Sequence, residues 1–118
     1  MRDKIILDKM IRYADKVCEY CKGVSYEDFR ANDMLVEACV FNLGQIGELT
    51  KKLGEDFKKE NPQVAWAQMI YGLRNRIVHD YEGVNLRLIW EIVSDDMPAL
   101  RCELNGMKKR FGESGQVC

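Results

Sequence analysis

The side chains best suited to acid–base and phosphate chemistry gather in one stretch of the chain, GLRNRIVHDY. This stretch holds the single histidine, His79, together with Arg74, Asn75, Arg76 and Tyr81. Histidine transfers protons near neutral pH, and arginine can bind a phosphate through two parallel hydrogen bonds. The stretch is therefore a candidate site for binding or cleaving a phosphodiester.

Helical spacing would arrange these side chains around one groove. Asn75 lies one turn before His79, so these two residues share a face of a helix. Arg74 and Tyr81 are seven residues apart and also share a face. Arg74 and His79 are five residues apart, which places them about 140° from each other around the helix axis. They would flank the groove without stacking.

Each of these residues also has a purely structural interpretation. Arg76 and Asp80 could form a plain surface ion pair, which stabilises a helix by about 0.2–0.5 kcal/mol. A lone histidine near a helix end is often a cap or a satisfied core residue. Tyr81 could be a packing residue with a hydrogen-bonded hydroxyl. Spacing alone leaves both interpretations open.

The elements that must position this stretch are helices. Apolar residues recur at helical spacing almost everywhere, and no segment shows sustained period-two alternation. The spacing predicts a short helical turn around residues 26–29 and four main helices, over residues 3–22, 32–54, 62–83 and 85–111. Because the connections are short, we expect an all-α, largely up-and-down four-helix bundle with short additional helical segments.

Capping residues and apolar stripes define these helices. Gly23 is expected to end the first helix, since glycine readily adopts the left-handed conformation found there. Ser25 and then Asn32, or its neighbour, are expected to cap the next two segments. Asn61 is expected to cap the helix that follows the charged stretch 55–60, which is predicted to be a connector. The stripe of the first helix is Ile6, Met10, Tyr13, Val17 and Cys21.

Four residues break the regular pattern inside the expected helices. Gly44 and Gly47 each cost about 1 kcal/mol of helix propensity relative to alanine, and we expect another helix to approach closely there. Asn42 interrupts the apolar stripe of the same helix. Pro98 is expected to kink or restart the last helix.

The amino-acid composition limits the classes of protein to which this chain can belong. The 118 residues predict one helical domain over residues 1–111, followed by a flexible tail over 112–118. Lys and Arg total 18 against 19 Asp and Glu, so a polybasic protein is excluded and any nucleic-acid site must be a local patch. No apolar run approaches the roughly 20 residues of a membrane span, and the charged start lacks a signal-peptide stretch. We expect a cytoplasmic protein with no membrane contact.

The five cysteines are scattered and odd in number, which argues against a disulfide framework. Cys18 and Cys21 form a CxxC motif, but a zinc site would need a second pair or nearby histidines. A redox CxxC normally follows a strand, and no strand is predicted here. We therefore expect these two residues to act as small apolar side chains on one helix face.

The pattern Arg-x4-His-x-Tyr at residues 74–81 resembles the signature of HEPN-domain proteins. The resemblance extends over about residues 5–110 and is closest to the HepT-like branch of that superfamily. The further segments that carry it are Ile46-Gly47-Glu48, Lys51-Lys52-Leu53, Pro62, Trp66, Trp90-Glu91 and Asp96-Met97-Pro98. No position within the signature departs from the pattern.

This resemblance implies a function. HepT-like proteins are toxins of prokaryotic toxin–antitoxin pairs, and they are small helical bundles that dimerise and cleave RNA without a metal or cofactor. It implies an RNA substrate, a homodimer and a second partner, a minimal nucleotidyltransferase antitoxin. That partner transfers AMP to the motif tyrosine, here Tyr81, and so silences the toxin. The chain lacks the Gly-Ser and Asp-x-Asp motifs of the transferase itself.

Metal-free RNA cleavage needs a base for the 2′-hydroxyl, an acid for the leaving oxygen and a cation for the phosphate. We expect His79 to be the general acid/base and Arg74 to stabilise the scissile phosphate. Asn75 would orient His79 or the substrate, while Arg76 and Tyr81 would contact RNA. Because one chain supplies one histidine, a two-fold dimer with both motifs in one cleft would supply the second.

Glu48 belongs to the neighbouring expected helix. It could hold Arg74 or cap the motif, or it could be a solvated or core-paired carboxylate, and the sequence leaves both open. Three other functions also stay open. They are a non-catalytic HEPN binding module that supports an adjacent nucleotidyltransferase, a structural dimerisation partner, and a toxin that acts on something other than RNA.

Overall fold

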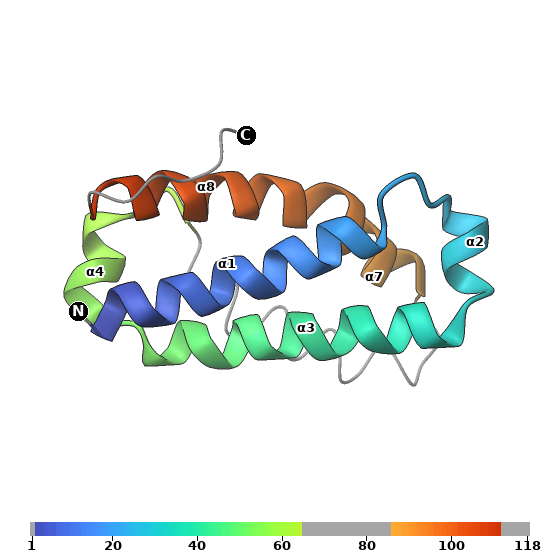
Figure 1. Ribbon diagram of the computed structural model, residues 1–118, viewed down its shortest axis with the longest axis horizontal. Helices are drawn as coiled ribbons and strands as arrows, with labels where there is room; N and C mark the ends of the chain where they lie inside the picture. Colours follow the sequence, from blue (N-terminus) through green and yellow to red (C-terminus); the bar gives the residue numbers. More distant parts are fainter. Residues whose placement is uncertain (1, 65–85, 112–118) are drawn as a thin grey trace.

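The computed structural model describes residues 2–64 and 86–111, and within them it contains helices and no strand (Figure 1). The elements are α1 (Arg2–Tyr20), α2 (Tyr26–Arg30), α3 (Asp33–Lys52), α4 (Glu55–Glu60), α7 (Leu86–Glu91), the π-helix η2 (Ile92–Asp96) and α8 (Met97–Lys109). The predicted all-α class is confirmed. Most of the helix predicted over 62–83 and the whole predicted tail over 112–118 lie outside the described residues.

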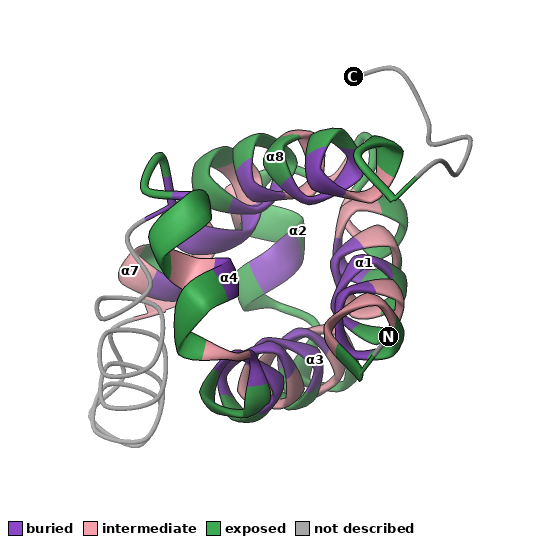
Figure 2. Ribbon diagram, turned by 90° about the vertical axis from the view of Figure 1, so that its left-hand side faces the viewer, coloured by how far each residue is buried: buried purple, intermediate pink, exposed green. Residues whose placement is uncertain are grey.

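Helix α1 packs against both α3 and α8 and runs antiparallel to each of them (Figure 1). Viewed from the α4 end, the buried sides of these three helices face one another (Figure 2). The buried residues of α1 are Ile6, Leu7, Met10, Ile11, Ala14 and Val17. The apolar stripe predicted for this helix is therefore narrower than the face that α1 buries. A helix with two neighbours buries a broader face, while Tyr13 and Cys21 are only partly buried.

Two ion pairs show the register between α1 and α8. Arg101 Nε lies 2.8 Å from Asp15 Oδ1, and Lys108 Nζ lies 3.6 Å from Asp8 Oδ1. Seven residues forward along α8 correspond to seven residues back along α1, as antiparallel packing requires. These side chains are partly exposed, so each pair contributes at most about 1 kcal/mol, and the buried apolar faces supply most of the stability.

The predicted helix ends are largely confirmed. Gly23 follows α1 with a φ of +73°, in the left-handed region that glycine tolerates best. Ser25 Oγ accepts a hydrogen bond from the backbone N–H of Asp28 at 3.1 Å and so caps α2. Asn32 Oδ1 accepts one from the N–H of Leu35 at 3.1 Å and caps α3. These caps fix where the chain turns between α1 and α3.

The side-chain amide of Asn42 in α3 is satisfied only in part, since its buried Oδ1 has no hydrogen-bond partner among the described residues. Asn42 is buried, and its Nδ2 donates to the carbonyl oxygen of Ala38 at 2.7 Å. A Cβ built on Gly44 meets no atom within 4 Å, so within residues 2–64 and 86–111 the predicted close approach of another helix is not found at this position. None of these residues requires glycine here, and against them Gly44 only costs helix propensity.

Two predictions around residue 60 were also wrong. The charged stretch 55–60 is helix α4 and not an irregular connector, and its Phe57 side chain is buried. Asn61 ends α4 and does not start a helix, since residues 62–64 form turns. Its Nδ2 donates to the carbonyl oxygen of Phe57 at 2.8 Å, and its Oδ1 accepts from Arg110. Periodicity failed here because a six-residue helix with one buried side chain has no repeat to detect.

The last helix is irregular near Pro98, as predicted. Helices α7 and α8 are joined without a break by the π-helical turn η2, and Pro98 lies in the first turn of α8. Asp96 keeps a helical backbone, with φ −75° and ψ −37°, and its side chain makes no capping bond. The helix is therefore deformed at this point but not restarted.

Alanine substitutions should separate the roles of the glycines. Gly44→Ala and Gly106→Ala should each raise the free energy of unfolding by about 0.5–1 kcal/mol, because both glycines are helical and have open space around them. Gly23→Ala should lower it by about 1 kcal/mol, since its positive φ strains any side chain. Urea denaturation measures all three. A destabilised Gly44→Ala protein would show that a neighbour does approach this position.

Candidate functional site

Five of the six predicted site residues lie outside the described residues. These are Arg74, Asn75, Arg76, His79 and Tyr81, and their roles stay predictions. Glu48 and the elements on either side of residues 65–85 are described. The structure therefore describes the scaffold that flanks the motif residues in the chain.

Glu48 is exposed on α3, between the buried residues Gly47 and Leu49. Its Oε1 lies 3.4 Å from Lys51 Nζ, one turn further along the helix, and half of its side chain remains exposed. A core-paired carboxylate, one of the two structural interpretations, is thereby excluded. An exposed pair at this spacing contributes about 0.2–0.5 kcal/mol.

The chain is firmly anchored where it enters and leaves the motif-bearing segment. On the entry side Val64 is buried, and Asn61 is held by Phe57 and Arg110. On the exit side Ile89 of α7 is 1% exposed. Helices α4 and α7 lie toward opposite ends of the bundle (Figure 1). Both ends of the segment are thus fixed by core packing and not by exposed loops.

An aromatic cluster joins α7 to α2. The ring of Trp90 lies 5.1 Å from that of Phe29 and 6.4 Å from that of Tyr26, measured between centroids. The guanidinium carbon of Arg87 lies 4.5 Å from the centroid of the Tyr26 ring. Cation–π contacts of this kind contribute about 0.5–1 kcal/mol at exposed sites. Periodicity gave no signal for the Arg87–Tyr26 contact, because the two residues belong to separate helices.

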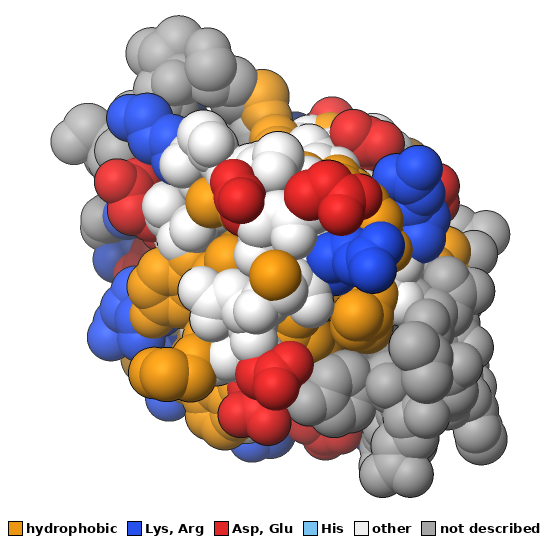
Figure 3. Space-filling view, turned by 90° about the vertical axis from the view of Figure 1, so that its right-hand side faces the viewer, with side chains coloured by type: hydrophobic (Ala, Val, Ile, Leu, Met, Phe, Trp, Pro, Cys, Tyr) orange, Lys and Arg blue, Asp and Glu red, His pale blue; other side chains and the backbone are white. Residues whose placement is uncertain are grey.

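The surface at the α2 end carries charges of both signs. Figure 3 shows lysine, arginine and acidic side chains interspersed with hydrophobic ones on this face. Glu27 and Asp28 lie in the first turn of α2, and Arg30 lies in its last turn. The described part of this face therefore forms no continuous basic patch.

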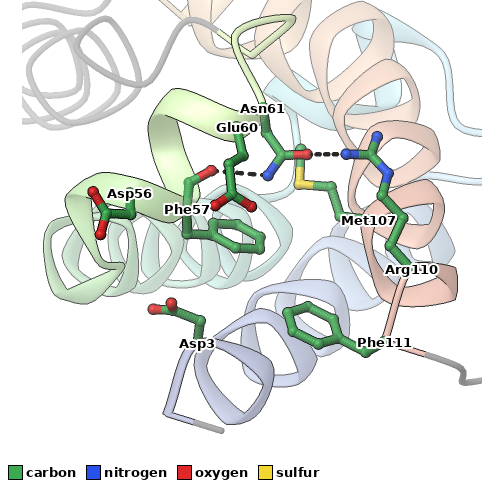
Figure 4. Close-up of a pocket in the computed structure, with 8 residues that line it drawn as sticks. All are labelled: Asp3, Asp56, Phe57, Glu60, Asn61, Met107, Arg110 and Phe111. Carbon is green, nitrogen blue, oxygen red and sulfur yellow. Dashed lines mark hydrogen bonds between the residues drawn. The ribbon is translucent and has the colours of Figure 1, made fainter.

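A pocket of about 290 Å³ lies at the other end, beside α4 (Figure 4). Its wall includes three carboxylates, of Asp3, Asp56 and Glu60, against one guanidinium, of Arg110. Asp3 accepts a hydrogen bond from the N–H of Gly54 at 2.9 Å, which ties α1 to the start of α4. The excess of negative charge repels phosphate, so this pocket is not a candidate RNA site.

The described residues contain neither a metal-binding cluster nor a helix able to span a membrane. Across residues 2–64 and 86–111, no group of three or more His, Cys, Asp or Glu side chains is arranged to hold a metal ion. In the same two ranges no helix combines the length and the apolar character that crossing a membrane would require.

Comparison with known families gives a match over most of the chain. The family described as "Ribonuclease HepT-like" matches residues 10–107. A Methanocaldococcus jannaschii protein described as a "putative RNase" is 35% identical over 101 residues, which cover 86% of this chain and 92% of that protein. A Caldanaerobacter subterraneus protein with the same description is 36% identical over 94 residues, covering 80% and 83% of the two chains.

A third relative carries the family name itself. The "probable ribonuclease HepT" of Thermococcus cleftensis is 28% identical over 106 residues, which cover 90% of this chain and 96% of that protein. No solved structure matches the chain.

Proposed function

Because this chain belongs to the ribonuclease HepT-like family, we propose that it is an endoribonuclease whose site is the stretch from Arg74 to Tyr81. One observation carries this proposal. The family match over residues 10–107 contains the complete Arg-x4-His-x-Tyr pattern, so the chemistry-bearing residues and the family coincide. The predicted HepT-like family and the all-α fold are thus both established, and the mechanism below is proposed.

The proposed reaction is attack of a ribose 2′-hydroxyl on the adjacent phosphorus. His79 removes the proton of that hydroxyl, and the oxygen then bonds to phosphorus. The bond to the 5′-oxygen breaks, and this oxygen takes a proton from an acid. Arg74 binds the phosphate oxygens and stabilises the negative charge that builds up in the transition state. Asn75 orients the imidazole or the substrate, and no metal takes part.

The proposed enzyme is a homodimer. The reaction needs a base and an acid, and the chain contains one histidine. A two-fold dimer brings two copies of His79 into one cleft, where one can act as base and the other as acid. It also doubles Arg74 and Arg76, which creates locally the positive charge that a net charge of −1 does not supply globally.

Glu48 is proposed to position Arg74. The carboxylate lies on α3 with half of its side chain exposed, so a guanidinium can reach it. A carboxylate that accepts hydrogen bonds from a guanidinium fixes the plane in which the guanidinium faces a phosphate.

The biological role is proposed to be that of a cytoplasmic toxin held in check by modification. A minimal nucleotidyltransferase antitoxin would transfer AMP to the hydroxyl of Tyr81. The modified tyrosine would carry a bulky phosphodiester anion close to His79 in sequence. Both the charge and the volume of this group would exclude RNA from the site.

Replacement of His79 tests the proposed catalysis. His79→Ala should lower the rate of RNA cleavage by about 10²–10⁴ in the presence of EDTA, because proton transfer contributes about that much. Glu103→Ala, an exposed change on α8, is the matched control and should cleave like wild type. Intact mass must first show that Tyr81 is unmodified. Equal rates for His79→Ala and wild type would overturn the assignment, and no cleavage by unmodified wild type would favour the non-catalytic binding module.

Replacement of Glu48 tests its positioning role. Glu48→Gln should lower kcat/KM about tenfold or more through loss of a charge-assisted hydrogen bond, while the free energy of unfolding changes by less than about 0.5 kcal/mol. Lys51→Met removes the surface partner of Glu48 and should leave kcat/KM near that of wild type. Equal effects of the two changes on kcat/KM would mean that Glu48 acts only through the surface pair.

Replacement of Tyr81 tests the proposed control by AMP. Incubation with ATP, Mg²⁺ and a minimal nucleotidyltransferase encoded beside this chain should add one AMP to wild type and abolish RNA cleavage. Tyr81→Phe should gain no AMP, and its rate of RNA cleavage should be the same with and without the transferase. Peptide mapping locates the modification. AMP on another residue, or full activity of the modified protein, would contradict the proposal.

A further inference from the structure

Two thiols, one from a turn and one from a helix, meet beside the core. Cys21 lies in the turn that follows α1, and Cys39 lies in the first half of α3. Their Sγ atoms are 3.6 Å apart, although the residues are 18 positions apart in the chain. The Cys39 side chain is fully buried, whereas Cys21 is partly exposed. Cys21 is therefore the more exposed residue of the pair, and Cys39 is covered by the core.

We propose that Cys21 and Cys39 form a reversible thiol–disulfide modification site that reacts with low-molecular-weight disulfides. The two sulfur atoms need to approach by about 1.5 Å to reach the bond length of about 2.0 Å. Cys21 lies in a turn and not inside a helix, so a small backbone adjustment there can supply this movement. This modification is independent of the proposed ribonuclease activity.

The environments of the two sulfurs assign their roles. The pKa of Cys21 is lowered, mainly because the Cys39 thiol donates a hydrogen bond to its thiolate. The pKa of Cys39 is raised, first by that hydrogen bond and then by burial and the charge of Cys21. The partly exposed Cys21 is therefore the thiolate that attacks first. Once Cys21 has reacted, its charge and hydrogen bond no longer hold the proton on Cys39.

The reaction proceeds by two exchanges. The Cys21 thiolate attacks a disulfide RSSR, forms a mixed disulfide with one R group and releases the other as RS⁻. Cys39 then loses its proton, to the released thiolate or to water, and attacks Cys21 Sγ. This step forms the Cys21–Cys39 bond and releases the second RS⁻. In sum, two protein thiols lose two electrons and two protons, and RSSR becomes two RSH.

Cys18 can be compared with Cys21 as a nucleophile, since both belong to the CxxC motif. It lies three residues before Cys21, but the cation that acts on its thiol is Arg101 of α8. Burial is the main cause that raises the pKa of Cys18. Cys18 is therefore the poorer nucleophile of the CxxC motif, and its sulfur has a different neighbour from that of Cys21.

The bond would join the turn that follows α1 to α3 and enclose Gly23 together with α2. A closed loop of this length restricts the unfolded chain strongly. We expect the melting temperature of the oxidised protein to exceed that of the reduced protein by roughly 10 °C.

The test is to incubate the full-length reduced protein with oxidised glutathione and map the product. Digestion with trypsin and with a protease that cuts after glutamate separates Cys18 from Cys21, because Glu19 lies between them. The expected product links the peptide of residues 20–22 to that of residues 38–48. Dithiothreitol should reverse both the link and the rise in melting temperature.

Three variants complete the experiment. Cys21→Ser and Cys39→Ala should each abolish the link and the gain in melting temperature, and Cys39→Ala should retain glutathione on Cys21. The matched control Cys18→Ser should form the link like wild type. A Cys18–Cys21 bond, a glutathione adduct that stays on Cys21 of the wild type, or no reaction at all would overturn the proposal.

Discussion

The packing of α1 between α3 and α8 is the constraint on which the rest of this bundle depends. Because α1 has two neighbours, it buries a broad apolar face, and its direction fixes the antiparallel direction of both partners. The short elements follow from this arrangement. Helix α2 covers the end where α1 turns back into α3, and α4 covers the end where α3 finishes (Figure 1). The ion pairs between α1 and α8 are consistent with this antiparallel register.

The scaffold separates positions that hold the fold from positions available for chemistry. On α3 the side chains of Ile46 and Leu49 are buried, while Glu48 between them is exposed. The two ends of the bundle also differ in charge, since carboxylates dominate the pocket beside α4. A polyanion such as RNA is disfavoured at that end. The proposed ribonuclease site therefore relies on Arg74 and Arg76 for its positive charge.

The sequence predicted the elements that rest on local interactions. Ser25, Asn32 and Gly23 act where their types predict, because caps and left-handed turns are decided within a few residues. Features that depend on two distant segments were missed. Periodicity places Cys21 on a helix face but cannot say that it meets Cys39. For the site, the motif predicted the family correctly, the exposure of Glu48 had been left open, and the roles of the motif residues are predictions still.

The π-helical turn η2 determines how far α7 is rotated about the helix axis relative to α8. Each residue of a helix adds about 100° of rotation, and a π-turn accommodates more residues per turn than an α-helix does. Removal of one residue from Ile92–Asp96 would therefore turn α7 by roughly that angle while α8 stayed in the core. Trp90 would then point away from Phe29, and Leu86 would leave the bundle in another direction. The number of residues in this turn thus determines the direction in which the side chains of α7 point.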